Sequence, residues 1–333
     1  VQRGLDLTGR VLLALGSRRS AWWAGTAAIA LAKIIENMEI GHNVIHGQWD
    51  WMNDPEIHSS TWEWDMAGVA KHWQITHNHS HHKYTNILDM DDDVGYGLLR
   101  VTRDQPWRPR NLLNVPFNAM LAIGFEWGIA LQHLEIGKIA DPETRTATVV
   151  RIKEFTAKAG RQVAKDYVVF PALSALSPWA GFGSTARANL CANLIRNLWT
   201  NAVIFCGHFP DGAEKFTLTD MAGESRGQWY LRQLLGSANI DAGRVLGFLT
   251  GNLSYQIEHH LYPNLPSHRL AGIAVRVRAL CAKYDLPYTS GSLPVQYGKT
   301  WRTIAKLSVP DRFLRDSADD APETRSERMF DAL

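Results

Sequence analysis

Long apolar stretches alternate with strongly polar segments along this chain of 333 residues. The clearest apolar stretch, residues 167–186, holds 20 residues without a charge, and residues 188–209 carry only Arg196. About twenty apolar residues in a helix can cross the hydrocarbon core of a bilayer. The sequence Gly-Phe-Gly-Ser at 181–184 offers a turn between the two stretches. We therefore predict two antiparallel membrane-spanning helices, at about 167–184 and 186–207.

Two further apolar stretches contain charges. Residues 20–40 open with a Trp-Trp pair suited to a membrane interface and include one lysine and two glutamates, whereas residues 111–133 contain Glu126. Charges in a membrane segment have to face a protein interior. We therefore expect a third span at 20–40, and we expect 111–133 to lie in the interface or to be buried. Burial of all four stretches in a soluble core is the alternative, and the mean hydropathy of −0.20 agrees with it.

The composition excludes several classes of protein. Lys and Arg number 35 and Asp and Glu 33, so the chain lacks the basic excess of a nucleic-acid binder. Its three cysteines show no CxxC spacing, which argues against a disulfide framework or a zinc ribbon. The charged residues 311–333 predict a loosely ordered tail after a domain at 1–310. Because the first residue is Val1 rather than Met, we expect a fragment of a longer protein.

Histidines carry the strongest chemical signal. Eight of the thirteen fall into an HxxxH pair, an HxxxHH group, a QxxHH group and one isolated position at the end of an apolar stretch. These eight residues are His42, His46, His77, His81, His82, His208, His259 and His260. Histidines at i and i+4 share one helix face, and imidazole is a ligand of iron, zinc, copper and nickel.

The number of histidines favours two metal ions over one. Eight imidazoles exceed the six positions of an octahedral ion, and a structural zinc ion needs only four ligands. The adjacent pairs His81–His82 and His259–His260 would each serve two neighbouring ions. His58, His72, His133 and His268 stand outside the groups, and we expect them at the surface or packed in the core.

With these groups in view, the chain resembles the membrane fatty acid desaturases. The resemblance covers nearly the whole chain, and four segments are similar to the actinobacterial stearoyl-CoA Δ9-desaturases. They are ENMEIGHNVIHGQWDW at 36–51, MDDDVGYG at 90–97, CGHFP at 206–210 and QIEHHLYP at 256–263. The resemblance implies an all-α integral membrane bundle with a cytosolic helical cap that carries a non-haem diiron site. It also implies a bacterial plasma membrane enzyme with its active site on the cytosolic side.

The resemblance further implies a reaction and a ligand set. Such an enzyme uses O2 and two electrons to introduce a cis double bond into a long-chain acyl-CoA, here expected to be stearoyl-CoA at Δ9. The eight grouped histidines would bind two iron ions. Gln256 replaces a histidine that opens the third box in animal Δ9 enzymes, so direct binding, binding through water and no binding all stay open for it.

Further site residues follow from the same picture. Glu36, Glu39, Asn78, His79 and Glu258 are candidate hydrogen-bond partners of the outer imidazole nitrogen atoms, although solvated helix ends are as good a reading for Glu258. Small residues on the 20–40 helix, Thr26, Ala27 and Ala30, are candidates to line the acyl tunnel. Arg100, Arg103, Arg108 and Arg110 are candidates to dock CoA phosphates or an acidic electron carrier, with a solvated basic face as the alternative.

Electrons have to come from a second protein. The sequence shows no His-Pro-Gly-Gly haem motif, no GxGxxG after a strand and no cysteine cluster, so we predict no bound haem, flavin or nicotinamide. The family implies a separate NADPH-dependent reductase, in some cases with a small carrier. Desaturases of other regioselectivity, such as the linoleoyl-CoA type, and hydroxylases or alkane monooxygenases remain alternatives. A zinc-binding membrane receptor is the alternative that is not an enzyme.

Overall fold

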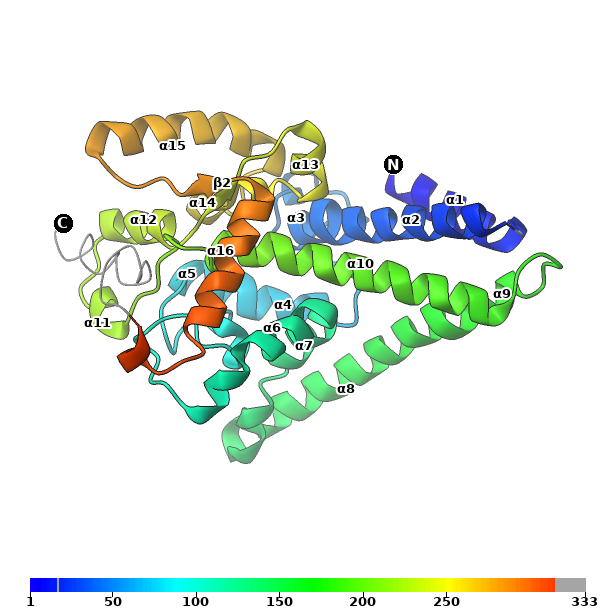
Figure 1. The fold of residues 1–333 in the computed structure, drawn as a ribbon, viewed down its shortest axis with the longest axis horizontal. Coiled ribbons are helices and arrows are strands. Elements are labelled where there is room, and N and C mark those ends of the chain that lie inside the picture. Colours follow the sequence, from blue (N-terminus) through cyan, green and yellow to red (C-terminus); the bar gives the residue numbers. More distant parts are fainter. Residues whose placement is uncertain (17, 315–333) are drawn as a thin grey trace.

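The protein is almost entirely helical in the computed structural model, which describes residues 1–16 and 18–314 (Figure 1). The helices are α1 Gln2–Leu15, α2 Arg19–Ile35, α3 Asn43–Ile45, α4 Ala70–Trp73, α5 His82–Tyr84, α6 Asn114–Ile123, α7 Phe125–Gln132, α8 Pro142–Ala164, α9 Phe170–Ser174, α10 Phe182–His208, α11 Leu218–Met221, α12 Arg226–Leu235, α13 Arg244–Leu249, α14 Gln256–Leu261, α15 Leu270–Tyr284 and α16 Leu293–Lys306. Two short parallel strands, β1 Asn239–Ile240 and β2 Ser290–Gly291, pair with each other. The predicted helical class is therefore confirmed, with this small addition.

Shorter helical turns connect these elements. Three are π-helical: η1 Glu36–His42, η3 Gln74–His81 and η7 Lys165–Val169. The 3-10 turns are η2 Asp50–Met52, η4 Gly95–Gly97, η5 Pro109–Leu113, η6 Ile136–Ala140, η8 Leu253–Tyr255, η9 Ser267–Arg269 and η10 Asp311–Phe313. Residues 315–333 of the predicted tail lie outside the described residues.

The helices form an arm and a head. In Figure 1, α1, α2, α8, α9 and α10 project together to one side, and the remaining elements gather into the head. Helix α2 continues without a break through η1 into α3, so this long helix enters the head with His42 near its end. Helix α10 also runs into the head and ends at His208. Two helices of the arm therefore carry His42 and His208 into the head.

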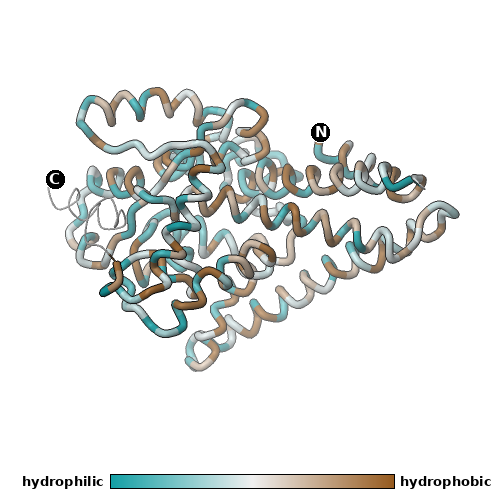
Figure 2. The backbone as a smooth tube through the Cα atoms, in the orientation of Figure 1, coloured by the Kyte–Doolittle hydropathy of each residue, from teal (hydrophilic) through white to brown (hydrophobic). Residues whose placement is uncertain are grey.

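The helical pair predicted at 167–184 and 186–207 has different bounds. The second helix, α10, begins at Phe182, but the first runs from Pro142 through η7 to Ser174, and the turn lies at 175–181. Asp141 caps its start by accepting a hydrogen bond from the backbone of Glu143, 3.0 Å away. The prediction at 167–184 was wrong because the polar first part of this helix carries no apolar signal. Figure 2 shows polar and hydrophobic residues interspersed along α8.

The apolar stretch at 111–133 is not one helix. It breaks at Gly124, between α6 and α7. Among residues 1–16 and 18–314, no single helix is both long and apolar enough to cross a membrane. The bent pair Pro109–Ile123 and Phe125–Ala140, which turns by 101°, meets the length and composition requirement jointly. The three stretches predicted as spans do not meet it individually.

Charged residues in the apolar stretches form buried ion pairs. Lys33 Nζ lies 2.9 Å from Asp166 Oδ2 and 3.3 Å from Asp65 Oδ2. Arg196, whose side chain is fully buried, pairs with Glu126. These pairs join α2, η7, α10 and α7, so each charge meets a partner of opposite sign where burial alone would be costly. The Lys33–Asp166 pair joins two elements of the arm, and the Lys33–Asp65 and Arg196–Glu126 pairs hold the arm against the head.

Candidate metal centre

Four segments of the chain carry the eight grouped histidines into the middle of the head. His42 and His46 come from η1 and the end of α3, and the second group comes from η3 and α5. His208 ends α10, and His259 and His260 lie on α14. All eight side chains are buried, with exposures of 7% or less. Two of the segments that carry them are π-helical, a distortion that is frequent at functional sites.

The histidines converge in two neighbouring groups. The ligand atoms of His42, His46, His77 and His259 lie within 4.8 Å of one another, and so do those of His81, His208 and His260. The adjacent pair His259 and His260 is divided between the groups, as the sequence predicted for two ions. Each group offers several imidazole nitrogen atoms to one centre.

His82 lies between the two groups. Its ring centroid is 4.7 Å from that of His46 and 4.8 Å from that of His259 in the first group. It is 4.4 Å from that of His260 in the second group, with the rings stacked. The structure therefore brings all eight sequence-predicted histidines together in one cluster.

Gln256 belongs to the second group. Its Nε2 lies 2.9 Å from His208 Nε2 and 3.3 Å from His260 Nε2, and these two ring atoms are 3.2 Å apart. Gly207 makes room for it, because a Cβ at that position would stand 2.8 Å from Gln256 Cγ. The side-chain amide thus lies where the nitrogen atoms of the second group meet.

Several ring nitrogen atoms have no hydrogen-bond partner among the described residues. Both nitrogen atoms of His46, His82 and His259 are buried and unpartnered. A buried polar atom without a partner is costly, and a metal ion removes that cost by accepting the nitrogen lone pair. These atoms fit a bound metal, and the clusters can hold one.

The electrostatics favour neutral imidazoles, which are the form that binds metal. Burial, together with neighbouring imidazoles, lowers the pKa of His46, His77, His82, His259 and His260 well below its ordinary value. Burial lowers the pKa of His42 to about 4. His81 differs: burial opposes its charged form, but the nearby Asp91 carboxylate raises its pKa.

Two aspartates orient the second histidine group of the sequence. His77 Nδ1 lies 3.1 Å from Asp93 Oδ2, and His81 Nδ1 lies 2.9 Å from Asp91 Oδ2. Gln132 at the end of α7 donates to Asp93 Oδ1, 3.0 Å away. A carboxylate at the outer nitrogen fixes the tautomer, so that Nε2 can face a metal.

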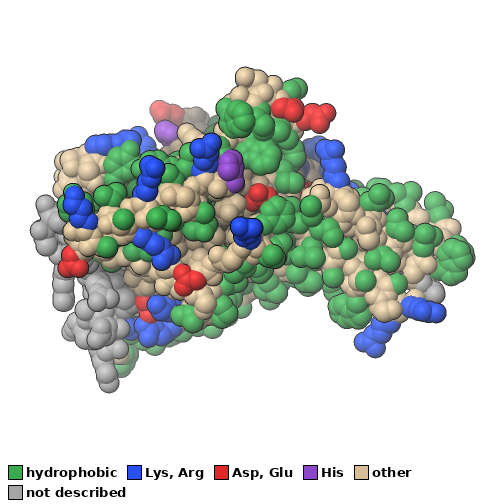
Figure 3. Space-filling view, turned by 90° about the horizontal axis from the view of Figure 1, so that it is seen from above, with side chains coloured by type: hydrophobic (Ala, Val, Ile, Leu, Met, Phe, Trp, Pro, Cys, Tyr) green, Lys and Arg blue, Asp and Glu red, His purple; other side chains and the backbone are tan. Residues whose placement is uncertain are grey.

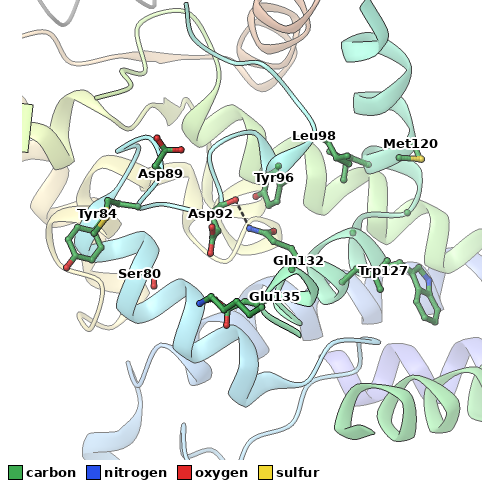
Figure 4. Close-up of a pocket in the computed structure, with 18 of the residues that line it drawn as sticks. Ser80, Tyr84, Asp89, Asp92, Tyr96, Leu98, Met120, Trp127, Gln132 and Glu135 are labelled. Carbon is green, nitrogen blue, oxygen red and sulfur yellow. Dashed lines mark hydrogen bonds and ion pairs between the residues drawn. The ribbon is translucent and has the colours of Figure 1, made fainter. Parts of the chain in front are cut away.

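Two cavities approach the site from the side of α7. An inner cavity of about 40 Å³ touches His42 and His77 and is lined mostly by apolar side chains, including Met38, Trp73 and Ile129. An outer cleft of about 1000 Å³ has a wall from α6 and α7 and a polar wall that includes Asp89 and Asp92 (Figure 4). Tyr96 lines both, so it stands at their junction.

Comparison with known proteins identifies the family. The fatty acid desaturase family model matches residues 20–292. The chain belongs to the fatty acid desaturase family. It is 71% identical, over its full length and 78% of the relative, to the NADPH-dependent stearoyl-CoA 9-desaturase of Mycobacterium tuberculosis. Two more distant relatives match shorter regions.

The first of these is fatty acid desaturase 3 of Homo sapiens. It is 23% identical over 230 residues, which cover 67% of this chain and 47% of that protein. The second is a Delta(8)-fatty-acid desaturase of Helianthus annuus, 31% identical over 122 residues, or 35% of this chain and 26% of that protein. These matches confirm the family resemblance expected from the sequence.

Other predicted residues of this desaturase lie away from the imidazoles. Glu36 accepts a hydrogen bond from the backbone of Asp65, and Glu258 accepts hydrogen bonds from Asn239 and Tyr288. Asn78 donates to the backbone oxygen of Ile45. Glu39 makes no described side-chain hydrogen bond to an imidazole, and His79 is exposed at the outer cleft. Among the described residues, none of these five candidates forms a hydrogen bond to a ring nitrogen of the eight grouped histidines.

The predicted tunnel residues on α2 do not line either cavity. Ala30 packs with Leu13, Ile29 and other residues in a small core between α1, α2 and α10. Thr26 is buried and donates to the backbone oxygen of Trp22, whereas Ala27 is exposed. Close helix packing therefore fills the space in which the sequence analysis expected a tunnel.

The predicted basic docking residues divide in two. Arg100 is buried, donates to the backbone of Gln105 and pairs with Asp311, so its guanidinium is engaged within the protein. Arg103 is half-buried, and Arg108 and Arg110 are exposed. The bystander His133 is buried beside the inner cavity, and His72 pairs with Glu154, 2.7 Å away.

Sequence reasoning missed the contribution of α12. Gln233 Oε1 lies 3.3 Å from His260 Nδ1, and Thr85 Oγ1 lies 3.2 Å from the same atom. Gln233 also donates to the backbone oxygen of His82. One glutamine thus connects the second and third histidine groups, a contact across about 150 residues that no local motif announces. The acidic residues at 89–93 can be read from the sequence, but their contacts with His77 and His81 cannot.

Proposed function

We propose that the chain is an acyl-CoA desaturase that introduces a cis double bond at Δ9 of stearoyl-CoA. The observation that carries this proposal is the pair of buried histidine groups next to an apolar cavity. The full-length similarity to a protein named as a stearoyl-CoA 9-desaturase supports the substrate and the position of the double bond. A long apolar chain needs such a dry cavity beside the reacting centre.

Two iron ions are the proposed cofactor. His42, His46, His77 and His259 would hold one, and His81, His208 and His260, with the Gln256 amide beside them, would hold the other. His82 lies between the groups and can serve either. When bound, the ions would supply the activation of O2 that removal of hydrogen from an unactivated methylene pair requires.

The protein's own residues position the acyl chain and exclude water. The acyl chain would enter from the outer cleft and pass Tyr96. Its reacting carbons would then lie in the inner cavity, beside His42 and His77. The Tyr96 ring stacks on Phe205, with centroids 5.5 Å apart, which fixes its place at the junction. The apolar lining of the inner cavity keeps bulk water from the reacting carbons.

We propose that the apolar part of the arm, formed by α1, α2, η7, α9 and α10, lies in the membrane, and that the polar first part of α8, which includes Lys153, lies outside it. On the face that Figure 3 shows, most charged side chains lie over the head, whereas hydrophobic side chains are abundant along the arm. Its exposed apolar residues are Leu7, Val11, Leu15, Trp23, Leu31, Val168, Val169, Leu173, Leu176, Trp179, Phe182, Leu190, Ile195 and Leu198. Helix α10, with 27 residues, extends roughly 40 Å, more than the hydrocarbon core.

Both helical hairpins of the arm return to the head, so every histidine group lies on one side of the membrane. Trp22, Trp23 and Trp179 gather at the far tip with Arg18 and other basic residues, as at a membrane interface. We place the head in the bacterial cytosol, where acyl-CoA and a separate NADPH-dependent reductase would be its partners.

Product analysis tests this function. The gene is expressed with an NADPH-linked reductase, the cells receive deuterated stearate, and the fatty acids are analysed by mass spectrometry. We expect oleate from the wild type and from H268A, whose exposed side chain lies outside the site, and none from H260A. An alcohol product would indicate a hydroxylase, and a double bond elsewhere would indicate another regioselectivity.

A further inference from the structure

A further surface pocket, next to the outer cleft, reaches His82. It has a volume of about 500 Å³, and its lining includes Lys83, Tyr84, Arg226 and Trp229. The two cavities assigned to the acyl chain reach His42 and His77 instead, by way of α7. The histidine cluster is therefore reached by two openings, which share Tyr84 in their linings, and the acyl chain accounts for only one of them.

Helix α12 connects this pocket to the segment that carries His82. Trp229 Nε1 and Arg232 Nη2 both donate to the backbone oxygen of Lys83, each at 3.2 Å. Lys83 follows His82 in the chain, so a single peptide bond separates the hydrogen-bonded residue from the imidazole-bearing one. A short connection of hydrogen and covalent bonds thus runs from the Trp229 indole at the surface to His82.

The pocket carries positive charge. Its lining includes three cations, Lys83, Arg226 and Arg232, and one carboxylate, Glu224. Glu224 pairs with the buried Arg232, so the exposed Lys83 and Arg226 remain to face solvent. The Arg226 guanidinium lies 4.8 Å from the ring centroid of Trp229. Exposed cations around an aromatic residue suit a transient contact with an acidic protein surface.

We infer that this pocket is the docking site of the electron donor, an acidic redox protein that is reduced at the expense of NADPH. The inference rests on the proposed function, which requires such a partner. Desaturation of one methylene pair consumes O2, two electrons and two protons and yields the double bond and two molecules of water. The substrate supplies the other two electrons, so the donor has to reach the metal centre in every turnover.

The phosphates of the substrate are a poorer occupant. If the reacting carbons lie beside the irons, eight carbons and the pantetheine arm separate them from the CoA phosphates. The pocket, in contrast, directly adjoins His82, a member of the cluster itself. A donor benefits from that closeness, whereas the phosphates of a bound acyl-CoA have to lie far from it.

Charge reversal at Arg226 tests the docking site. Arg226 is exposed and is the first residue of α12, where glutamate favours the helix, so R226E should fold. The matched control is K153E on α8, which lies far from α12 in Figure 1. The probe is the NADPH-linked reductase fraction that restores turnover to the purified, detergent-solubilised chain. Binding of this fraction to the chain is measured directly, alongside turnover.

For R226E at low salt we expect about a fivefold weaker binding of the reductase and a matching rise in its KM. The KM for acyl-CoA and the rate at saturating reductase should stay unchanged, and K153E should resemble the wild type. Carbodiimide should cross-link Lys83 to reductase carboxylates, and K83Q should lose that cross-link.

Two results would overturn the docking site. One is unchanged reductase binding in R226E together with a cross-link elsewhere, and the other is a rise in the KM for acyl-CoA alone, which would assign the pocket to the substrate. Failure of the proposed function looks different. In that case the wild type would form no double bond even when a chemical reductant replaces the reductase.

Discussion

The metal centre depends on how each imidazole is held. Burial keeps most of these rings neutral, and carboxylates or amides at the outer nitrogen atoms set their orientation. Asp93 contacts His77 on one oxygen and Gln132 on the other, so it also links the metal centre to the wall of the outer cleft. Small changes at such partners should therefore affect the metal before they affect the fold.

Replacing Asp93 by asparagine should weaken metal binding. D93N keeps the size of the side chain but removes the charge that orients His77, and loss of such a partner typically costs about 10–100-fold in metal affinity or activity. The control is D92N, because Asp92 is exposed and only its backbone contacts Gln132. Metal titration of the purified variants measures the effect, and equal affinities for D93N and D92N would contradict the assigned role.

Substitution of Gly207 tests whether the Gln256 side chain helps to bind the metal. A methyl group at Gly207 would stand 2.8 Å from Gln256 Cγ, so G207A should move the amide away from His208 and His260. If the amide helps to hold the second ion, G207A and Q256A should both lower metal content and turnover. G183A is the control, since a Cβ at Gly183 meets nothing within 4 Å. Full metal content in both test variants would leave Gln256 without a role at the metal.

The sequence predicted which histidines cluster, because their spacing is a local property. The HxxxH and adjacent pairs identify residues that one helical segment has to present together, and the structure brings all eight into one cluster. Their hydrogen-bond partners depend on contacts that spacing does not encode. Gln233 meets His260 from another helix, and Glu258 turns to Asn239 and Tyr288 although it precedes His259. Proximity in sequence was therefore a poor guide to these partners.

At the scale of elements, apolar content alone misjudged the helices. The helix Pro142–Ser174 begins with a polar part that only its Asp-Pro capping signal announces, and the stretch 111–133 bends at Gly124. The bend has a consequence for function, because α6 and α7 then form one wall of the outer cleft and α7 reaches the inner cavity. The acyl chain is therefore expected along α7 rather than along α2.

Filling the inner cavity should alter catalysis without removing the metal. I129W places an indole in a cavity of about 40 Å³, so we expect lower turnover of stearoyl-CoA, with metal content unchanged. The control is I123W, because Ile123 is exposed and lines neither cavity. Activity with acyl-CoA substrates of several lengths measures the effect. If I129W and I123W have the same turnover and chain-length profile, the acyl chain runs elsewhere.

The same substitution at Ala30 should act on stability instead. Ala30 is packed between α1, α2 and α10, and overpacking a close-packed core costs about 1–3 kcal/mol. A30W should thus lower the thermal unfolding temperature, whereas A27W at the exposed neighbour should not. A stable A30W variant that prefers shorter acyl chains would instead support the acyl tunnel along α2 that the sequence predicted.

At the scale of the whole molecule, an apolar arm and a charged head suggest how the enzyme meets its substrates. The arm would hold the protein in the membrane, and the head would expose one opening to the acyl chain and another to the electron donor. Separate openings allow the donor to dock while the substrate is bound. The Lys33–Asp65 and Arg196–Glu126 pairs link the two parts.

The arm predicts firm membrane association. After cell lysis the protein should remain with the membrane fraction through washes with high salt and with carbonate, and only detergent should release it, because α1, α2, η7, α9 and α10 expose many large apolar side chains. Fractionation followed by immunoblotting checks this, with a known peripheral protein as the control. Release by carbonate without detergent would show that the arm does not span the membrane.

Metal content tests the central claim most directly. If the two histidine groups form a diiron site, protein purified anaerobically in its active form should contain two iron atoms per chain, and H260A should contain fewer. Elemental analysis by mass spectrometry, combined with quantitative amino-acid analysis, gives this ratio. One metal ion per chain, or stoichiometric zinc in the active enzyme, would contradict the account.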